Sequence, residues 1–321
     1  MSEAQLVRRV RELFSGRIGD DAAVVGDQVL TTDMLIEDVD FTKSIPLRLI
    51  ARKSLAVNLS DLAAMGAEPT VALVGLALPP WALENVDEIL TSLASFAKEY
   101  GIEIVGGDFS RADKLTIAIT AIGRVVGRPL LRSTARPGDR IFLSRTIGGS
   151  GTGLSLLARG WTATGMAPAG FGFSEREFGF SAIQRHVDPQ PEIEIGLKLA
   201  AMPEVTSCID VSDGLSTDLH HLCEASGCGA EIERERLPVM QDLFELAPRL
   251  GVNVADVVLN GGEEYALLFT ARARESEMSR KLGRPVYAIG RMTASAGVML
   301  VQDGVPRPLA PAGFDHFSGA S

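Results

Sequence analysis

Residues 55–65 of this 321-residue chain read Leu-Ala-Val-Asn-Leu-Ser-Asp-Leu-Ala-Ala-Met. Apolar side chains lie almost all round the helix that this segment predicts, so the helix should be buried. The polar side chains Ser54, Asn58 and Asp61 are spaced i, i+4 and i+7 and form one narrow stripe along it. A buried carboxylate needs hydrogen-bond partners or a metal ion, because an unpaired charge is costly inside a protein. We therefore interpret Asp61 as a functional residue.

Predicted helices and strands alternate on both sides of this segment. The predicted helices cover residues 4–14, 46–65, 82–100, 153–159, 192–200, 213–225 and 240–250. The predicted strands cover residues 22–25, 29–32, 71–78, 103–105, 115–126, 140–144, 207–209, 230–233, 265–271, 286–292 and 298–302, and residues 160–180 are expected to be irregular. The alternation favours an α/β (α+β) fold. The turn at 136–139, Arg-Pro-Gly-Asp, is the expected boundary between an N-terminal domain, 1–137, and a C-terminal α/β domain, 138–321.

The composition is globular and acidic. With 31 basic and 41 acidic residues, the formal net charge is −10, which offers no basic patch to nucleic acid or to a membrane. The longest apolar run, within 71–80, is too short to cross a bilayer, and residues 1–11 lack the apolar core of a signal peptide. Cys208, Cys223 and Cys228 suit free thiols better than a disulfide framework or a metal site. We expect a cytoplasmic protein.

Acidic residues recur at predicted strand ends and turns, where side chains from distant segments can converge. They are Asp20, Asp21, Asp33, Asp108, Asp210 and Asp213. Any one of them is more often a turn or helix-cap residue than a ligand. As a set, their hard oxygen donors suit Mg²⁺, which beside nucleotide phosphates neutralises the charge of phosphoryl transfer. The sequence therefore predicts a magnesium-dependent enzyme that uses ATP.

The glycine-rich segment 148–153 follows a predicted strand and precedes a predicted helix, so its amides could cradle a phosphate. It lacks the lysine of a P-loop and only loosely matches a dinucleotide fingerprint, so a structural turn is an equally acceptable interpretation. The histidines His186, His220, His221 and His316 lack metal-ligand spacing. The sequence supports no Ser-His-Asp or Cys-His catalytic arrangement.

Taken together, a series of ordered motifs resembles thiamine-monophosphate kinases. The motifs are Gly19-Asp20-Asp21-Ala22-Ala23, Thr31-Thr32-Asp33, the segment 58–67, Gly106-Gly107-Asp108, Asp210-Val211-Ser212-Asp213-Gly214-Leu215, Gly261-Gly262-Glu263-Glu264-Tyr265 and the tail Gly313-Phe314-Asp315-His316-Phe317. The resemblance implies ATP-dependent phosphorylation of thiamine monophosphate to thiamine diphosphate. It also implies the two-domain aminoimidazole ribonucleotide synthetase-like fold and a homodimer, with the N-terminal sheets forming a barrel. The nucleotide is then expected in a groove between domains and subunits.

The same resemblance implies a role for each matching residue. Several Mg²⁺ ions would be held by Asp21, Thr31, Thr32, Asp33, Asp61, Asp108, Asp210 and Asp213. ATP would contact Gly107, Asp108, Arg132 and Ser212, and thiamine monophosphate would contact Asp40, Glu263 and Phe314. A guanidinium pairs well with phosphate, and an aromatic ring with a carboxylate suits a cationic ligand. Direct in-line transfer needs no general base, because the acceptor phosphate is already anionic near neutral pH.

Two positions depart from the family pattern, and two other functions stay open. Asp40 stands where a histidine is common, and Glu264-Tyr265-Ala266 stands where Asp-Tyr-Glu is usual. The first alternative is another ATP-dependent enzyme of the superfamily, such as a purine-pathway synthetase, which the segment 58–67 disfavours. Selenide-activating and hydrogenase-maturation members are disfavoured because they need a reactive cysteine or selenocysteine near one end. The second alternative is a regulator that binds ATP and Mg²⁺ without turnover, which the complete metal set disfavours.

Overall fold

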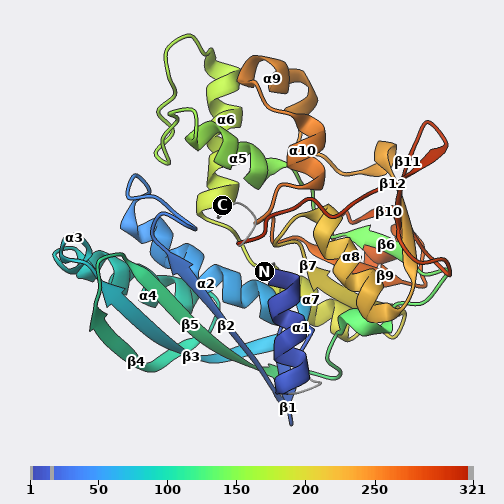
Figure 1. Cartoon of the computed structure of the whole chain (residues 1–321), viewed down its shortest axis with the longest axis horizontal. Helices are drawn as coiled ribbons and strands as arrows, with labels where there is room; N and C mark the ends of the chain where they lie inside the picture. The colour runs from blue at the N-terminus through green and yellow to red at the C-terminus, as the bar shows by residue number, and fades with distance from the viewer. Residues whose placement is uncertain (1–2, 15–17, 317–321) are drawn as a thin grey trace.

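The computed structural model describes residues 3–14 and 18–316, which form two β-sheets with helices around them (Figure 1). Phe317, from the expected tail motif, lies outside the described residues. Among the described residues, the N-terminal sheet has five strands in the order β1-β2-β5-β3-β4. These are β1 (Ala23–Val25), β2 (Gln28–Ile36), β5 (Thr116–Val125), β3 (Ala67–Leu78) and β4 (Glu103–Arg111). Neighbouring strands are antiparallel, except that β3 and β4 are parallel.

The second sheet of the described chain has seven strands in the order β12-β11-β8-β10-β6-β9-β7. These are β12 (Val305–Pro308), β11 (Val298–Gln302), β8 (Gly229–Glu233), β10 (Tyr287–Thr293), β6 (Arg140–Leu143), β9 (Leu267–Ala271) and β7 (Val205–Asp210). In this sheet β8 and β11 are parallel and the other neighbours are antiparallel. The fold is therefore the mixed α/β arrangement that the alternation predicts.

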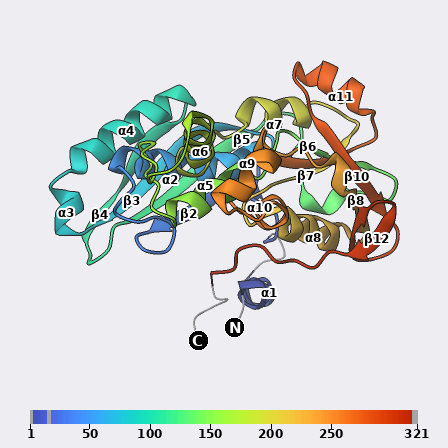
Figure 2. The same cartoon turned by 90° about the horizontal axis from the view of Figure 1, so that it is seen from above.

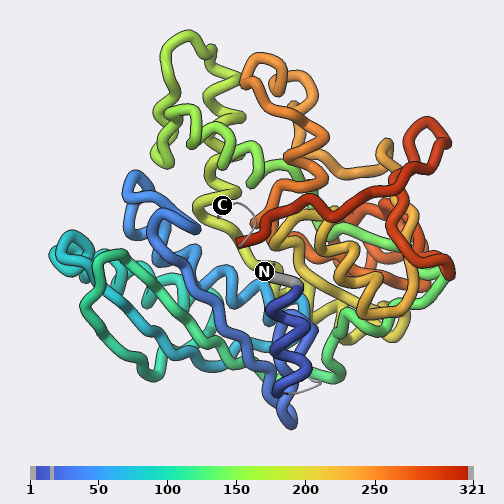
Figure 3. The backbone as a smooth tube through the Cα atoms, viewed as in Figure 1, coloured from blue at the N-terminus to red at the C-terminus, as the bar shows by residue number. Residues whose placement is uncertain are grey.

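The helices fall into groups that Figures 2 and 3 show from two sides. Those of the N-terminal half are α1 (Glu3–Leu13), α2 (Leu47–Ala64), α3 (Pro80–Leu83) and α4 (Val86–Glu99). Near the second sheet lie α7 (Ile193–Ala200), α8 (Leu215–Ser226) and α11 (Glu275–Leu282). A separate group consists of α5 (Gly149–Leu157), α6 (Phe173–Val187), α9 (Leu243–Leu250) and α10 (Val254–Leu259). Short 3-10 turns cover Arg132–Thr134 and Arg234–Arg236.

Helix α2 joins the two halves of the molecule. It packs on β2, β3 and β5, against α4, and on its other side against α7 and β7. The approach to α7 is close, because a Cβ added at Gly196 would lie 2.0 Å from the Ala63 carbonyl oxygen. Most of its side chains are buried, as its apolar sequence predicts. The predicted buried helix is thus confirmed, and it places Asp61 where the two halves meet.

Several predicted elements were wrong in extent. Strand β2 continues past residue 32 to Ile36, so Asp33 lies inside it, and β4 continues past residue 105 through the Gly-Gly-Asp motif. The segment expected to be irregular, 160–180, belongs to α6 from residue 173 onward, while α10, α11 and β12 were missed. Sheet pairing extends β2 and β4 beyond what their own sequences indicate. The expected boundary at 136–139 lies between β5 and β6, and the division into domains 1–137 and 138–321 stays a prediction.

No helix within the described residues is both long enough and apolar enough to cross a membrane.

Candidate active site

Three carboxylates from distant segments meet where α2 contacts β7. Asp21 precedes β1, Asp61 lies in the last turn of α2, and Asp210 ends β7. One oxygen from each lies within 4.8 Å of those of the other two. Thr31 Oγ1 donates to Asp61 Oδ2 at 2.5 Å, and Ser60 Oγ donates to Asp210 Oδ2 at 2.5 Å. The cluster is therefore positioned by side chains of both halves.

Burial and mutual repulsion dominate the electrostatics of this carboxylate cluster. Burial, followed by the charge of Asp33, raises the pKa of Asp61 well above its usual value. Burial, followed by the charge of Asp21, does the same to the pKa of Asp210. Although its helix is buried, the Asp61 residue itself is partly exposed, because it opens into a cleft. Hard oxygen donors held together against their own repulsion fit a divalent cation such as Mg²⁺.

Arg132 adds a positive charge at the edge of the cluster. Its Nη2 donates to Asp21 Oδ1 at 2.6 Å and its Nε donates to Asp21 Oδ2 at 3.3 Å, so the pair is bidentate. Its backbone N–H donates to Asp20 Oδ1 at 2.8 Å. Burial alone would lower the pKa of Arg132, but Asp21 raises it. The structure thus brings an expected phosphate contact next to an expected metal ligand.

The cleft beside the cluster has a volume of about 780 Å³ and is lined from both halves of the chain. Predicted site residues that line it are Asp33, Asp40, Asp61, Asp210, Ser212, Asp213, Glu263 and Phe314. Phe314 is 52% exposed, and its ring meets the His316 ring edge-on at 4.8 Å between centroids. Asp40 Oδ2 accepts from the Ile36 backbone N–H at 2.7 Å, and burial raises the pKa of Asp40. One cleft therefore holds the three expected substrate contacts and four of the eight expected metal ligands, while Asp21, Thr31 and Arg132 lie outside its lining.

Glu263 presents its carboxylate to this cleft from a strained backbone. Its φ of +58° is in the left-handed region, which non-glycine residues seldom adopt. Lys53 Nζ lies 2.7 Å from the carboxylate and His186 Nδ1 lies 3.0 Å from it. Burial alone would raise the pKa of Glu263, but Lys53 and His186 lower it to about 2. Glu263 is therefore anionic throughout the physiological pH range.

A second group of possible ligand atoms comprises Asp213, Asp218 and His221, whose donor atoms also lie within 4.8 Å of one another. Asp218 Oδ2 accepts from the backbone N–H groups of Asp213 at 3.1 Å and Gly214 at 3.0 Å. Burial, followed by the charges of Asp213 and Asp210, raises the pKa of Asp218 well above its usual value. Asp218 thus fixes the turn that carries Ser212 and Asp213 into the cleft.

Two of the expected contacts, Thr32 and Asp108, lie on the opposite face of the N-terminal sheet. Thr32 Oγ1 bonds with Thr120 Oγ1 at 3.1 Å and donates to the Ile119 carbonyl, so its hydroxyl turns away from Asp61. Asp108 pairs in register with Gly75 across the parallel ladder of β3 and β4. Gly107 and Asp108 are exposed and line no part of the cleft. Within the described part of one chain, the expected metal and ATP set is therefore divided.

The glycine-rich segment is a structural turn in this chain. The backbone N–H groups of Gly148 and Ser150 donate to Glu264 Oε1 at 2.8 and 2.9 Å. An internal carboxylate therefore occupies the amides that a phosphate would need.

Sequence reasoning missed Lys53, His186, Asp218 and His316. Lys53 is only 3% exposed. Its one signal in the sequence was that a lysine stands in a helix predicted to be buried. His186 gave no signal, because its partner Glu263 lies in the remote loop before β9. Asp218 and His316 have partners close in sequence, Asp213 and Phe314, and the motifs that contain those two residues were the available signal.

Comparison with known proteins shows the family of this chain. Residues 19–125 match the family AIR synthase related protein, N-terminal domain, and residues 136–302 match the AIR synthase related protein, C-terminal domain. The chain is 36% identical to the thiamine-monophosphate kinase of Haemophilus influenzae, over 99% of this chain and 98% of that one. It is 35% identical to that of Bacillus subtilis, over 94% and 93%. The solved structure described as AaThiL complexed with AMPPCP and TMP is similar with a TM-score of 0.86 and 31% identity, over 98% and 97%.

Proposed function

This chain belongs to the thiamine-monophosphate kinases of the AIR synthase related family, and we propose that it phosphorylates thiamine monophosphate to thiamine diphosphate with ATP. The observation that carries the proposal is the convergence of Asp21, Asp61 and Asp210 beside a cleft that Glu263 and Phe314 also line. The first three suit a metal ion and the last two suit an organic cation.

Mg²⁺ is the cation that this donor set fits. Asp21, Asp61 and Asp210 would hold it, with Thr31 and Asp33 beside them and Asp213 lining the same cleft. When bound, Mg²⁺ would neutralise negative charge that develops on the transferred phosphoryl group. Arg132 would pair with a phosphate of ATP, a role supported by its bidentate pairing with Asp21, which holds the guanidinium beside the carboxylate cluster. Ser212 would contact the same nucleotide from the end of β7.

The substrate side of the cleft orients a cationic, flat molecule. Glu263 stays ionised and can attract the thiazolium charge, while Phe314 offers a ring face or edge. Asp40 adds a second acid to the lining of the same cleft. The acceptor is a phosphate monoester, whose oxygen is already anionic near neutral pH, so in-line attack requires no side-chain base. We assign none.

We propose that the chain acts as a homodimer in the cytoplasm. The face of the N-terminal sheet that carries Thr32 and Asp108 also exposes Met34 (56%) and Leu73 (44%). An apolar sheet face of this kind favours a covering partner. If a second copy covers it, Gly107 and Asp108 become available to the partner's ATP and Mg²⁺. Three buried free thiols suit a reducing compartment.

The test is an assay of purified protein with ATP, Mg²⁺ and thiamine monophosphate, in which chromatography follows thiamine diphosphate. Product that disappears on addition of EDTA is the expected result. A folded protein that binds Mg²⁺–ATP in calorimetry and forms no thiamine diphosphate would overturn the proposal. Activity on purine-pathway substrates would then indicate the synthetase alternative, and no activity would indicate the regulator.

A further inference from the structure

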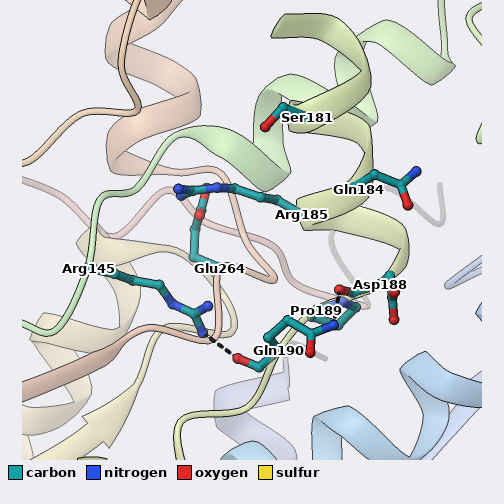
Figure 4. A pocket seen from close by; sticks show the side chains of 8 residues that line it. All are labelled: Arg145, Ser181, Gln184, Arg185, Asp188, Pro189, Gln190 and Glu264. Carbon is teal, nitrogen blue, oxygen red and sulfur yellow. Dashed lines mark hydrogen bonds between the residues drawn. The ribbon is translucent and has the colours of Figure 1, made fainter. Parts of the chain in front are cut away.

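Glu264 follows the substrate-facing Glu263 and points away from the cleft. Its carboxylate is 7% exposed and accepts the Gly148 and Ser150 backbone N–H groups at the start of α5. In Figure 4 the Arg185 side chain extends to the Glu264 carboxylate, in a pocket of about 290 Å³ that Arg145 also lines. The mechanism proposed above does not use this buried acid.

The backbone around Glu264 is strained and therefore needs restraint. Glu263 and Tyr265 both have positive φ, +58° and +48°. Such non-glycine conformations cost on the order of 1 kcal/mol each and persist only when neighbouring groups enforce them. The Glu263 N–H donates to the Ser212 carbonyl at 2.6 Å, the Tyr265 N–H to the Val211 carbonyl at 2.8 Å, and Arg145 Nη2 to the Tyr265 carbonyl. Glu264, between the two strained residues, supplies the restraint from the side of α5.

The two adjacent carboxylates are linked through a single residue, Ser150. The Ser150 N–H bonds Glu264, while its hydroxyl lies 3.1 Å from His186 Nδ1. The same nitrogen, His186 Nδ1, lies 3.0 Å from Glu263 Oε2, so the two contacts share one atom of the ring. Glu264, Ser150, His186 and Glu263 therefore form a closed ring, and the loop backbone connects its ends.

We propose that Glu264 is a positioning residue that sets the place of the Glu263 carboxylate for the cationic part of the substrate. By anchoring the first turn of α5, it holds Ser150 where the hydroxyl meets His186, and His186 then holds Glu263. This inference rests on the proposed function, since Glu263 is the substrate contact there. The N-terminus of α5 serves as an internal anchor, and the anion at that terminus is the protein's own carboxylate.

The test compares Glu264→Gln with Ser150→Ala. The assays are run at pH 8, because burial raises the pKa of Glu264 to about 7 and the carboxylate is mostly ionised above that pH. Glu264→Gln then keeps the size of the side chain and removes the charge that strengthens two amide hydrogen bonds. We expect the KM for thiamine monophosphate to rise about tenfold, with kcat and the KM for ATP changed by less than about twofold. Ser150→Ala leaves the buried carboxylate intact and breaks the ring at His186, so it should raise the same KM by a smaller factor.

The matched control is Glu175→Gln, which removes another buried carboxylate of the same helical group. Glu175 pairs with Arg249 and lies outside the ring, so its loss should lower thermal stability without a selective rise in the KM for thiamine monophosphate. An unchanged KM in both ring variants, with thiamine diphosphate still formed, overturns the positioning role and leaves the kinase intact.

A readout independent of turnover separates the two proposals. Amide hydrogen exchange of residues 262–266 should be faster in Glu264→Gln than in the wild type and unchanged in Glu175→Gln. If the wild type forms no thiamine diphosphate, the proposed function fails, and this exchange measurement still decides the positioning. Equal exchange rates at 262–266 in Glu264→Gln and the wild type overturn it.

Discussion

The two faces of the N-terminal sheet differ in how much of the expected site a single chain forms. On the face against α2, Thr31 is 8% exposed and its hydroxyl bonds Asp61 in the carboxylate cluster. On the other face, the next residue, Thr32, bonds Thr120, and Asp108 lies exposed on the edge strand. Because successive side chains of a strand point to opposite faces, one short motif serves two surfaces. The difference teaches that the part of the site on the face against α2, the inner face, forms within one chain. The residues on the other, outer face would need a partner chain to complete a site.

The largest effect is expected from the inner face. Asp61→Asn removes a central carboxylate of the cluster and should lower turnover about 10³-fold, because the divalent cation loses a charged ligand. In EDTA the same variant should be more stable to urea than the wild type, since burial and like charges disfavour ionised Asp61. Asp27→Asn, in an exposed turn, is the control and should change neither property. Unchanged turnover and Mg²⁺ dependence in Asp61→Asn would remove this residue from the site.

The next largest effect tests the outer face. Asp108→Asn should lower turnover about 10²-fold even though Asp108 lines no part of its own chain's cleft. The sharper measurement mixes inactive Asp61→Asn and Asp108→Asn chains after unfolding and refolding. If Asp108 acts in the partner's site, half of the dimers are mixed and each holds one intact site, so about a quarter of wild-type activity should return.

Whether activity returns in the mixture distinguishes an Asp108 that acts in the partner's site from one that acts in the site of its own chain. If Asp108 served its own chain, every site of the mixed dimer would carry one defect. Size-exclusion chromatography of both variants gives the control, because the mixture is informative only where each variant still forms the wild-type oligomer. No recovery from a mixture that does form dimers contradicts the division between the two faces.

The contrast between the faces also marks what the sequence could predict. The apolar helix around Asp61 follows from local periodicity, so its burial was predictable, and the function of its polar stripe stays a prediction. Thr32 and Asp108 were harder, because their faces depend on β2 and β4 extending through the motifs, and pairing with β5 and β3 decides that. A strand's extent is set by its neighbours, which lie far away in the sequence.

Long-range side-chain pairs were beyond prediction for the same reason. Lys53 and Glu263 are 210 residues apart, and Glu264 is 116 residues from the amide of Gly148 that it accepts. The motif containing Glu263 was recognisable, but nothing local indicates that its two acids face opposite ways. That arrangement needs the left-handed φ of Glu263 and Tyr265, which non-glycine residues do not signal.

A smaller effect should separate the adjacent threonines. Thr31→Val removes the hydrogen bond to Asp61 from a buried position, and we expect about a tenfold loss of turnover and a weaker apparent affinity for Mg²⁺. Thr32→Val removes a bond to Thr120 on the exposed face and should change both by less than about threefold in the same assay. Mg²⁺ titrations of both variants at saturating ATP provide the measurement. Equal effects would mean that the two hydroxyls act at one site and that the division between faces is wrong.

The smallest effect concerns the other adjacent pair with opposite orientations, Glu263 and Glu264. Burial raises the pKa of Glu264 to about 7, so its contribution to stability is present at low pH and is lost as the pH rises through about 7. Despite burial, Lys53 and His186 lower the pKa of Glu263 to about 2, so its contribution is constant from pH 5 to 8 and is lost only as the pH falls through about 2. Urea unfolding of the wild type and Glu264→Gln from pH 5 to 8 should therefore show a stability difference that falls with rising pH, by roughly 2 kcal/mol. Because the ring links Glu264 to His186, the same comparison is repeated in a His186→Gln background, which removes the titration of His186 from the difference. A difference that does not vary with pH would mean that Glu264 titrates outside this range, and the anchor at α5 would then hold the same charge state throughout.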